Sequence, residues 1–211
     1  MSADVAALRS LLPPETIARR QTRPQAEERR WSRAALSGRL TELSVWGGGA
    51  ALTLAVELVL SAQREGEPSA WITSAAETFY PPDAARNGVD LEALLVVRCP
   101  DARAMGAAAD KLARSGAFGL IIIDLGEGDL AVPVQSRLVN LAQKHDCAVV
   151  CLTKKTTEMP SLGSLVALRA QATYHPLPDG RFVCGVHALK DKQRGPGWSE
   201  EVVRHGPPGL C

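Results

Sequence analysis

The stretch RLTELSV-WGGG-AALTLAVELVLSAQRE, residues 39–65, places a strand, a glycine turn and a helix in direct succession. Residues 39–45 alternate between polar and apolar side chains, a pattern that predicts a β-strand. Residues 50–65 have the composition of a helix with apolar positions almost all round, and Gly66 follows as a stop signal. We therefore expect the chain to pass from a strand into a helix through a tight turn at residues 46–49.

Strands and helices continue to alternate after this unit. We expect further strands at residues 70–74, 91–98, 118–125 and 147–152, and helices at residues 101–115 and 134–145. These strands are apolar on both faces, which is typical of a mostly parallel sheet flanked by helices. Three later strand candidates follow one another directly, through turns such as Pro178-Asp179-Gly180: residues 164–170, 181–189 and 200–204. The sequence thus predicts an α/β fold whose sheet has an antiparallel C-terminal edge.

Residues 1–37 differ in composition from the rest of the 211-residue chain, because arginines crowd there. Short helical pieces are expected at residues 5–12, 15–20 and 25–36. We predict a basic helical N-terminal arm over residues 1–37 and a single core domain over residues 38–211. Charge runs of this kind are usually solvated, which favours an arm that packs loosely on the domain. An arm that contacts a partner, phosphate groups or a second copy of the chain remains the alternative.

Composition excludes several classes of protein. The net charge is only +1, so no global field draws the chain to nucleic acid or to a membrane. The N-terminus does not read as a signal peptide, and the longest apolar runs are too short to span a bilayer. The five cysteines are odd in number and widely spread, which favours a reducing compartment and predicts a cytoplasmic protein. Cys147 and Cys151 are interpreted as buried thiols rather than metal ligands.

The glycine turn occupies the place of a phosphate-binding loop. Such a loop needs glycines around the phosphates, a lysine for the β- and γ-phosphates, and a Ser or Thr for magnesium. At that spacing Val45 and Ala50 stand at the two glycine positions, Ala51 at the lysine and Leu52 at the hydroxyl. A triphosphate and its metal would have no specific partner, so we expect neither a nucleotide cofactor nor ATP hydrolysis. Inside the turn lie Gly47, Gly48 and Gly49, which favour a simple strand-to-helix turn over a residual anion site.

Four segments resemble the ATPase core of the bacterial recombinase RecA: GRLTEL (38–43), LTLAVELVLSAQREG (52–66), ARNGVDLEALLV (85–96) and DKLARSGAFGLIIIDL (110–125). The resemblance implies a RecA-like fold in which Asp124 is the Walker B aspartate. It places Ala75 where the family has its catalytic glutamate, so it implies that this chain is not an enzyme. The loops that match the family's DNA-binding loops are short, residues 126–133 and 153–163. We also expect the core to lack the family's C-terminal domain.

A short, degenerate RecA-like chain resembles the ImuA-type proteins in particular. These are accessory subunits of mutagenesis cassettes that DNA damage induces in the SOS response. The resemblance implies a non-catalytic role in translesion synthesis through contacts with the recombinase or an inactive Y-family polymerase homologue, with weak or indirect DNA binding. Three alternatives remain: a SulA-like cell-division inhibitor, a direct DNA-binding repair factor, and a nucleotide hydrolase with an unconventional site.

Several basic residues and one tryptophan are candidates for partner or phosphate contacts. Trp46, at the glycine turn, either fills the vacated phosphate pocket or is an exposed anchor for a partner. Trp71 lies within a predicted strand and is expected in the core. Two groups of basic residues complete the candidates. Lys154 and Lys155 lie in a loop that is either simply exposed or contacts phosphate groups. Lys190, Lys192 and Arg194 alternate along an extended segment, so they could form one basic stripe or simply be a solvated edge strand.

Overall fold

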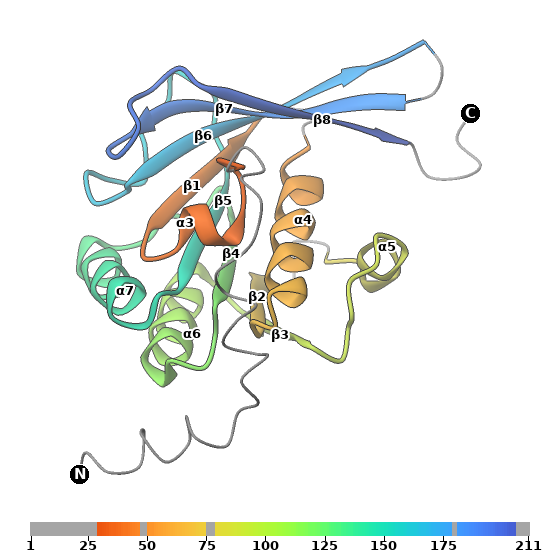
Figure 1. The fold of residues 1–211 in the computed structure, drawn as a ribbon. Helices are drawn as coiled ribbons and strands as arrows, with labels where there is room; N and C mark the ends of the chain where they lie inside the picture. The colour runs from red at the N-terminus through yellow and green to blue at the C-terminus, as the bar shows by residue number, and fades with distance from the viewer. Residues whose placement is uncertain (1–28, 47–49, 75–78, 179–180, 206–211) are drawn as a thin grey trace, which may run out of the picture.

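The computed structural model describes residues 29–46, 50–74, 79–178 and 181–205 (Figure 1). The predictions for the helical pieces before residue 29, for Gly47, Gly48 and Gly49, and for Ala75 lie outside the described residues. One sheet runs through the described part, with strands in the order β3-β2-β4-β5-β1-β6-β7-β8. Their bounds are β1 Leu40–Val45, β2 Ser69–Ser74, β3 Leu94–Cys99, β4 Leu120–Gly126, β5 Ala148–Lys154, β6 Leu168–Pro176, β7 Arg181–Asp191 and β8 Ser199–His205.

The strands from β3 to β6 in this order are parallel to one another, whereas β7 pairs antiparallel with β6 and β8 pairs antiparallel with β7. The predicted mostly parallel sheet with an antiparallel C-terminal edge is therefore confirmed. Helices lie on both faces of the sheet (Figure 1). Their bounds are α3 Arg33–Leu36, α4 Ala51–Arg64, α5 Pro81–Arg86, α6 Ala102–Ser115 and α7 Val132–His145.

The central strand β4 shows why the sheet is covered on both sides. Leu120 and Ile122 belong to the core cluster beneath α4, and Ile121 and Ile123 belong to the cluster beneath α6 and α7. All four side chains are completely buried. Alternate residues of a strand face opposite sides, so a run of four apolar residues requires a helix layer on each face. Trp71, in β2, is buried in the α4-side cluster, as expected.

A shifted strand and an additional helix are the main differences from the prediction. The strand expected at residues 164–170 begins only at Leu168 and continues to Pro176. The four residues before it end a connection whose last residue, Ala167, donates its N–H to the carbonyl of Leu40, 2.8 Å away. The short helix α5 was not expected. Its sequence PPDAAR begins with two prolines, which are tolerated in the first turn of a helix because no N–H is needed there.

Residues 29–37, the described part of the predicted arm, pack onto the core. Trp31 is buried, and its indole N–H donates to the carbonyl of Leu54 in α4 at 3.2 Å. The Nε of Arg33 forms an ion pair with the carboxylate of Glu65, the residue after α4, at 2.8 Å. A helix was expected over residues 25–36, and in the described part only α3 is helical, with Ser32 as its N-cap. The boundary between residues 37 and 38 stays a prediction. None of the helices in the described ranges is long and apolar enough to cross a membrane.

Candidate functional site

The turn from β1 into α4 lies at the carboxyl end of the parallel strands. Val45 ends β1 half-buried, and Ala50 precedes α4 with no side-chain hydrogen bond to cap the helix. Ala51 is buried in the core, whereas Leu52 is 50% exposed. Trp46 is 66% exposed, so the open question about this residue is resolved in favour of an exposed side chain. The described residues at the start of α4 therefore present apolar groups.

Two ionisable residues share this edge of the sheet. Lys154, at the end of β5, is the register partner of Val45 and is exposed. Asp124 lies in β4 opposite Leu152 of β5 and is buried. One strand separates β4 from β1, so Asp124 is about 10 Å from β1 in the plane of the sheet. The fold thus gathers Asp124 and Lys154 around the carboxyl end of β1, although they come from separate segments.

Thr53 is the nearest hydroxyl to the position that magnesium would require, one residue beyond it. Its side chain hydrogen-bonds to the thiol of Cys184 in β7. Burial raises the pKa of Cys184 to about 11, and the contact with Thr53 acts in the opposite direction. Thr53 thus contacts β7, one of the antiparallel strands. No group of three or more His, Cys, Asp or Glu residues that could hold a metal ion occurs in the described part of the chain.

A buried carboxylate, Glu42 of β1, holds the connection between β5 and β6. Its Oε2 accepts hydrogen bonds from the Ser161 hydroxyl at 2.7 Å and from the Leu162 N–H at 3.0 Å. Its Oε1 accepts from the Thr153 hydroxyl at 3.1 Å and lies 3.4 Å from the Lys155 ammonium. Glu42 is completely buried. Four groups on β5 and its following loop thus converge on one acidic side chain.

Arg169 of β6 completes this ionic centre. Its Nε lies 4.0 Å from Glu42, and its guanidinium donates to the carbonyls of Thr156, at 2.8 Å, and Met159. The predicted contact residue Lys155 is therefore turned inward, where it also donates to the carbonyl of Pro160. Sequence reasoning missed Glu42, and the available signal was a charged residue between two buried leucines in a central strand. Residues 157–160 of this loop are exposed, and the ion pairs of Lys155 and Arg169 with Glu42 hold the loop to the core.

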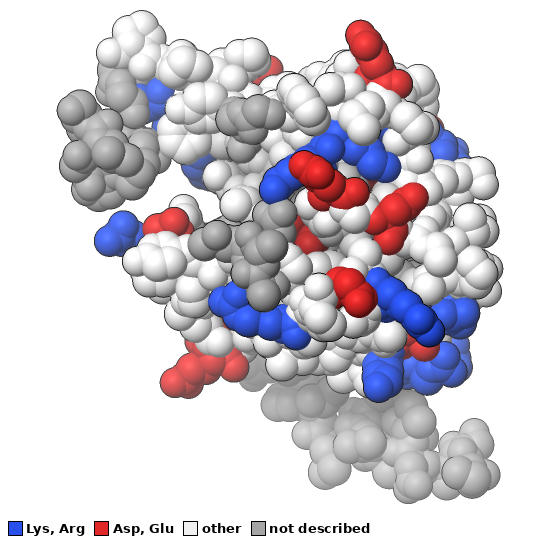
Figure 2. Space-filling view, turned by 180° about the vertical axis from the view of Figure 1, so that it is seen from behind, with Lys and Arg blue, Asp and Glu red and all other residues white. Residues whose placement is uncertain are grey.

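The second basic group lies at the opposite, amino end of the parallel strands. The prediction that Lys190, Lys192 and Arg194 form one extended stripe is wrong, because β7 ends at Asp191 and a turn follows. Lys192 donates to the carbonyl of Ser164 at 2.6 Å. Burial, followed by the charge of Lys192, lowers the pKa of Lys190. On the rear face of the molecule, basic and acidic side chains are interspersed, in keeping with the small net charge (Figure 2).

Part of the chain is similar in sequence to known proteins. No protein-family model matches the chain. Over 132 residues the chain is 34% identical to Protein RecA of Leifsonia xyli and 38% identical to that of Nocardioides sp., which covers 56% of this chain in each case. It is 32% identical over 117 residues to Protein RecA of Chlorobium chlorochromatii, covering 50% of this chain. The core of this protein is RecA-like.

The likeness is limited in extent. The matched segments cover 36%, 37% and 33% of those three RecA proteins, so the chain spans about a third of the length of the relatives it matches. The observed sheet agrees with the RecA-like α/β fold expected from the sequence. The RecA-like core therefore accounts for the architecture of the sheet.

Proposed function

We propose that this chain is a non-catalytic RecA-like accessory protein of the DNA-damage response, which supports translesion synthesis and induced mutagenesis through protein contacts. The observation that carries the proposal is the start of α4. There Ala51 and Leu52 occupy the positions at which a phosphate-binding loop needs a lysine and a hydroxyl.

The packing around these residues supports the absence of catalysis. Ala51 lies in the core, so its position offers no open space for a long cationic side chain. The hydroxyl of Thr53 is hydrogen-bonded to Cys184 of β7. A P-loop stabilises its phosphates by charge and by a bound metal, and neither is supplied by these side chains.

The connection between β5 and β6 supports a role without strand exchange. This loop resembles in position one of the DNA-binding loops of the recombinase family. Here its Lys155 is paired with Glu42, and Arg169 fixes its main-chain carbonyls. A loop whose cations are engaged internally has little charge left for phosphate groups.

Exposed apolar side chains at the carboxyl end support a protein partner. Trp46 and Leu52 flank the glycine turn and are at least half exposed. Tryptophan is enriched among the residues that dominate binding energy in protein interfaces. The partners that fit the proposal are the recombinase and an inactive Y-family polymerase homologue.

Calorimetric titration with ATP and magnesium tests the first half of the proposal. We expect no saturable heat from this chain, with a RecA protein as the positive control. Saturable binding that Asp124→Ala abolishes would make the chain a nucleotide-binding protein. Lys154→Ala identifies the cation if a residual anion site exists at this edge.

Binding to purified partners tests the second half. The chain is titrated with the recombinase and with the polymerase homologue, and then compared with the double variant Trp46→Ala/Leu52→Ala. We expect the double variant to lose about thirtyfold in affinity, which corresponds to about 2 kcal/mol. Tyr80→Ala removes a similarly exposed aromatic residue elsewhere and serves as the matched control. Binding to a cell-division protein instead would select the inhibitor alternative.

A further inference from the structure

A groove runs along the outer face of α4, opposite the residues that this helix buries in the core. Two cavities of about 630 Å³ and about 490 Å³ form it, and they meet because Leu60 and Arg64 line both. The main lining residues of α4 recur at intervals of one to four positions along one face of the helix: Thr53, Val56, Glu57, Leu60 and Arg64. The groove therefore follows about 16 Å of the helix axis, which is the length of three helical turns.

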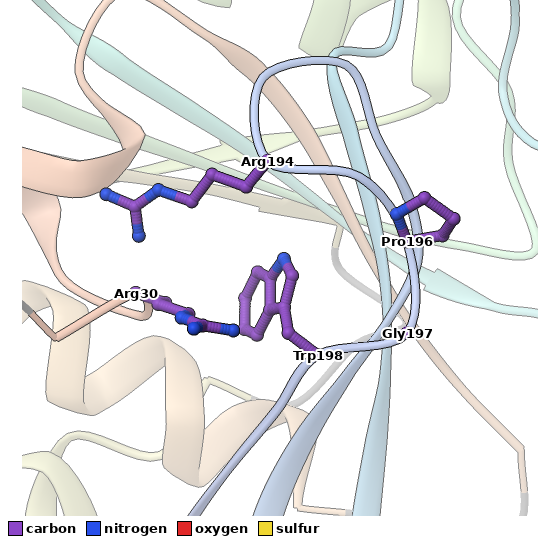
Figure 3. Close-up of a pocket in the computed structure, with 5 residues that line it drawn as sticks. All are labelled: Arg30, Arg194, Pro196, Gly197 and Trp198. Atoms are coloured by element: carbon purple, nitrogen blue, oxygen red, sulfur yellow. The ribbon is translucent and has the colours of Figure 1, made fainter.

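The segment before α3 forms one wall of the groove and is fixed to β8. The N–H groups of Arg30 and Trp31 donate to Oε2 of Glu200 at 2.8 and 3.0 Å. The guanidinium of Arg30 lies 5.7 Å from the centre of the Trp198 ring, a cation–π contact that directs this side chain to the start of β8 (Figure 3). The ring is held in turn by Asp191, which accepts from its indole N–H at 3.1 Å. This wall is therefore in place before any partner binds.

The loop after α5 forms the other wall and is tied to α4. The side-chain amide of Gln63 donates to the carbonyl of Asp90 at 2.7 Å and accepts from the N–H of Asp90 at 3.0 Å. In Figure 1, α4 lies between α3 and α5. Val56 and Leu60 are half-buried against the core cluster beneath α4, so their exposed atoms give the groove an apolar floor.

The charged side chains of the larger cavity are unequally engaged. Oε1 of Glu57 accepts from Nε of Arg204 at 2.6 Å, and the carboxylate of Glu65 is already paired with α3 at 2.8 Å. Arg29 and Arg64 are exposed lining residues, and within the described part of the chain neither guanidinium takes part in an ion pair or a hydrogen bond. The charge that is still available for a ligand of this cavity is therefore positive.

We propose that this groove binds an acidic amphipathic helix of a partner protein. Its apolar residues contact Val56 and Leu60, and its carboxylates pair with Arg29 and Arg64. Helices that bind in grooves use apolar residues at positions i, i+3, i+4 and i+7, which is the length that this groove offers. The groove is separate from the surface of Trp46 and Leu52, so the inference goes beyond the proposed function and does not rest on it.

The lining of the groove disfavours a phosphate backbone as the ligand. A nucleic acid requires cations along its whole length, whereas the cations here flank an apolar floor. The carboxylates of Glu57 and Glu65 lie in the same cavity and would repel phosphate groups. An acidic helix places its charges only at the rim and covers the floor with apolar side chains.

Fluorescence anisotropy with a labelled probe peptide of about 14 residues tests the groove on the full chain. The acidic probe carries Leu at positions i, i+3, i+4 and i+7 and Glu at the flanking positions, and the basic probe has Lys in place of every Glu. We expect the wild type to prefer the acidic probe. Arg29→Glu/Arg64→Glu should weaken its binding about tenfold or more and strengthen that of the basic probe, because two attractive charge pairs become repulsive.

The controls separate this groove from other charges and from the glycine turn. Arg103→Glu/Lys111→Glu reverses two exposed charges on α6, which packs on the opposite face of the sheet, and should leave the affinity almost unchanged. Trp46→Ala/Leu52→Ala should also leave probe binding unchanged, so a failure of the proposed function and a failure of this inference are distinguishable. Urea unfolding of each variant establishes that it is folded.

A photo-crosslinking residue in place of Val56 identifies the occupant, and irradiation should link it to the acidic probe. Equal affinity of the wild type and Arg29→Glu/Arg64→Glu for this probe, or equal binding of the two probes, would overturn the proposal. A cross-link to residues 1–28 of the same chain that the probe does not reduce would assign the groove to that segment, and a cross-linked dimer would assign it to a second copy. Displacement of the probe by oligothymidine that requires both arginines would assign it to nucleic acid.

Discussion

Two neighbouring connections leave the carboxyl end of the sheet and are held in opposite ways. The connection after β5 is fixed by the buried Glu42, which collects two hydroxyls, a main-chain N–H and the ammonium of Lys155. The connection after β1 enters α4 at Ala50, without a side-chain cap, and exposes Trp46 and Leu52. Charge stabilises the first connection, whereas the described residues on either side of the glycine turn are apolar. The proposal of a protein partner at this edge rests on this difference.

Removing the charge of Glu42 is the strongest way to break the comparison. Glu42→Gln leaves Lys155 and Arg169 buried without their counter-charge, so we expect a loss of about 3–5 kcal/mol in the free energy of unfolding, measured in urea. The exposed Glu92→Gln is the matched control and should change stability by less than about 0.5 kcal/mol. A loss below about 1 kcal/mol for Glu42→Gln would mean that the loop is held by other contacts.

Asp191→Asn tests the second buried carboxylate, at the amino end. Asparagine keeps an acceptor for Trp198 but loses the charge that Arg39 pairs with, so we expect a loss of about 2–3 kcal/mol near neutral pH. Burial alone would raise the pKa of Asp191, but hydrogen bonds from Gln193 and Trp198 and the charge of Arg39 more than offset it and lower the pKa.

The sign of the pH dependence follows from this lowered pKa. The charge on Asp191 stabilises the fold fully above the unfolded pKa of about 3.9, and this stabilisation is lost as the pH falls through the lower folded pKa. Urea unfolding of the wild type and Asp191→Asn should therefore differ most near neutral pH and converge in acid. A difference that grows as the pH falls would contradict the assignment.

Helix capping provides a smaller contrast. Asp101 has extended backbone angles and accepts a hydrogen bond from the N–H of Ala104 at 2.7 Å, so Asp101→Ala should cost about 1 kcal/mol. Ala50 has φ −89° and ψ 21°, which is not the extended conformation of a good N-cap. Ala50→Ser should therefore change stability by less than about 0.5 kcal/mol. Thermal unfolding compares the two variants, and an equal gain and loss would show that α4 does accept a side-chain cap.

The smallest effect is expected at the exposed side of α4. Leu52→Ala replaces a half-exposed leucine by the best helix former, so the free energy of unfolding should change by less than about 0.5 kcal/mol. This substitution should lower the affinity for the partner without changing the free energy of unfolding. A loss above about 1 kcal/mol in urea would make Leu52 a structural residue and remove it from the proposed interface.

Sequence patterns predicted most strands because buried strands have apolar residues at regular spacing. The run Leu120–Ile123 required helices on both faces and has them. The stripe of Lys190, Lys192 and Arg194 was not correctly predicted, because the end of β7 depends on where β6 begins to pair. Glu42 was missed for the same reason, since a lone acid in a strand does not reveal that a loop more than a hundred residues later supplies its partners.

The sequence by itself determined the layered parallel sheet and the residue types at the glycine turn, because apolar periodicity and the identity of Ala51 and Leu52 are local properties. Tertiary structure alone decided which charges meet. Arg39 and Asp191 are 152 positions apart, and Arg204 and Glu57 are 147 apart, yet the side chains of both pairs are in hydrogen-bonding contact. Such contacts depend on strand order and register, which are set by how the whole core packs and not by any local pattern.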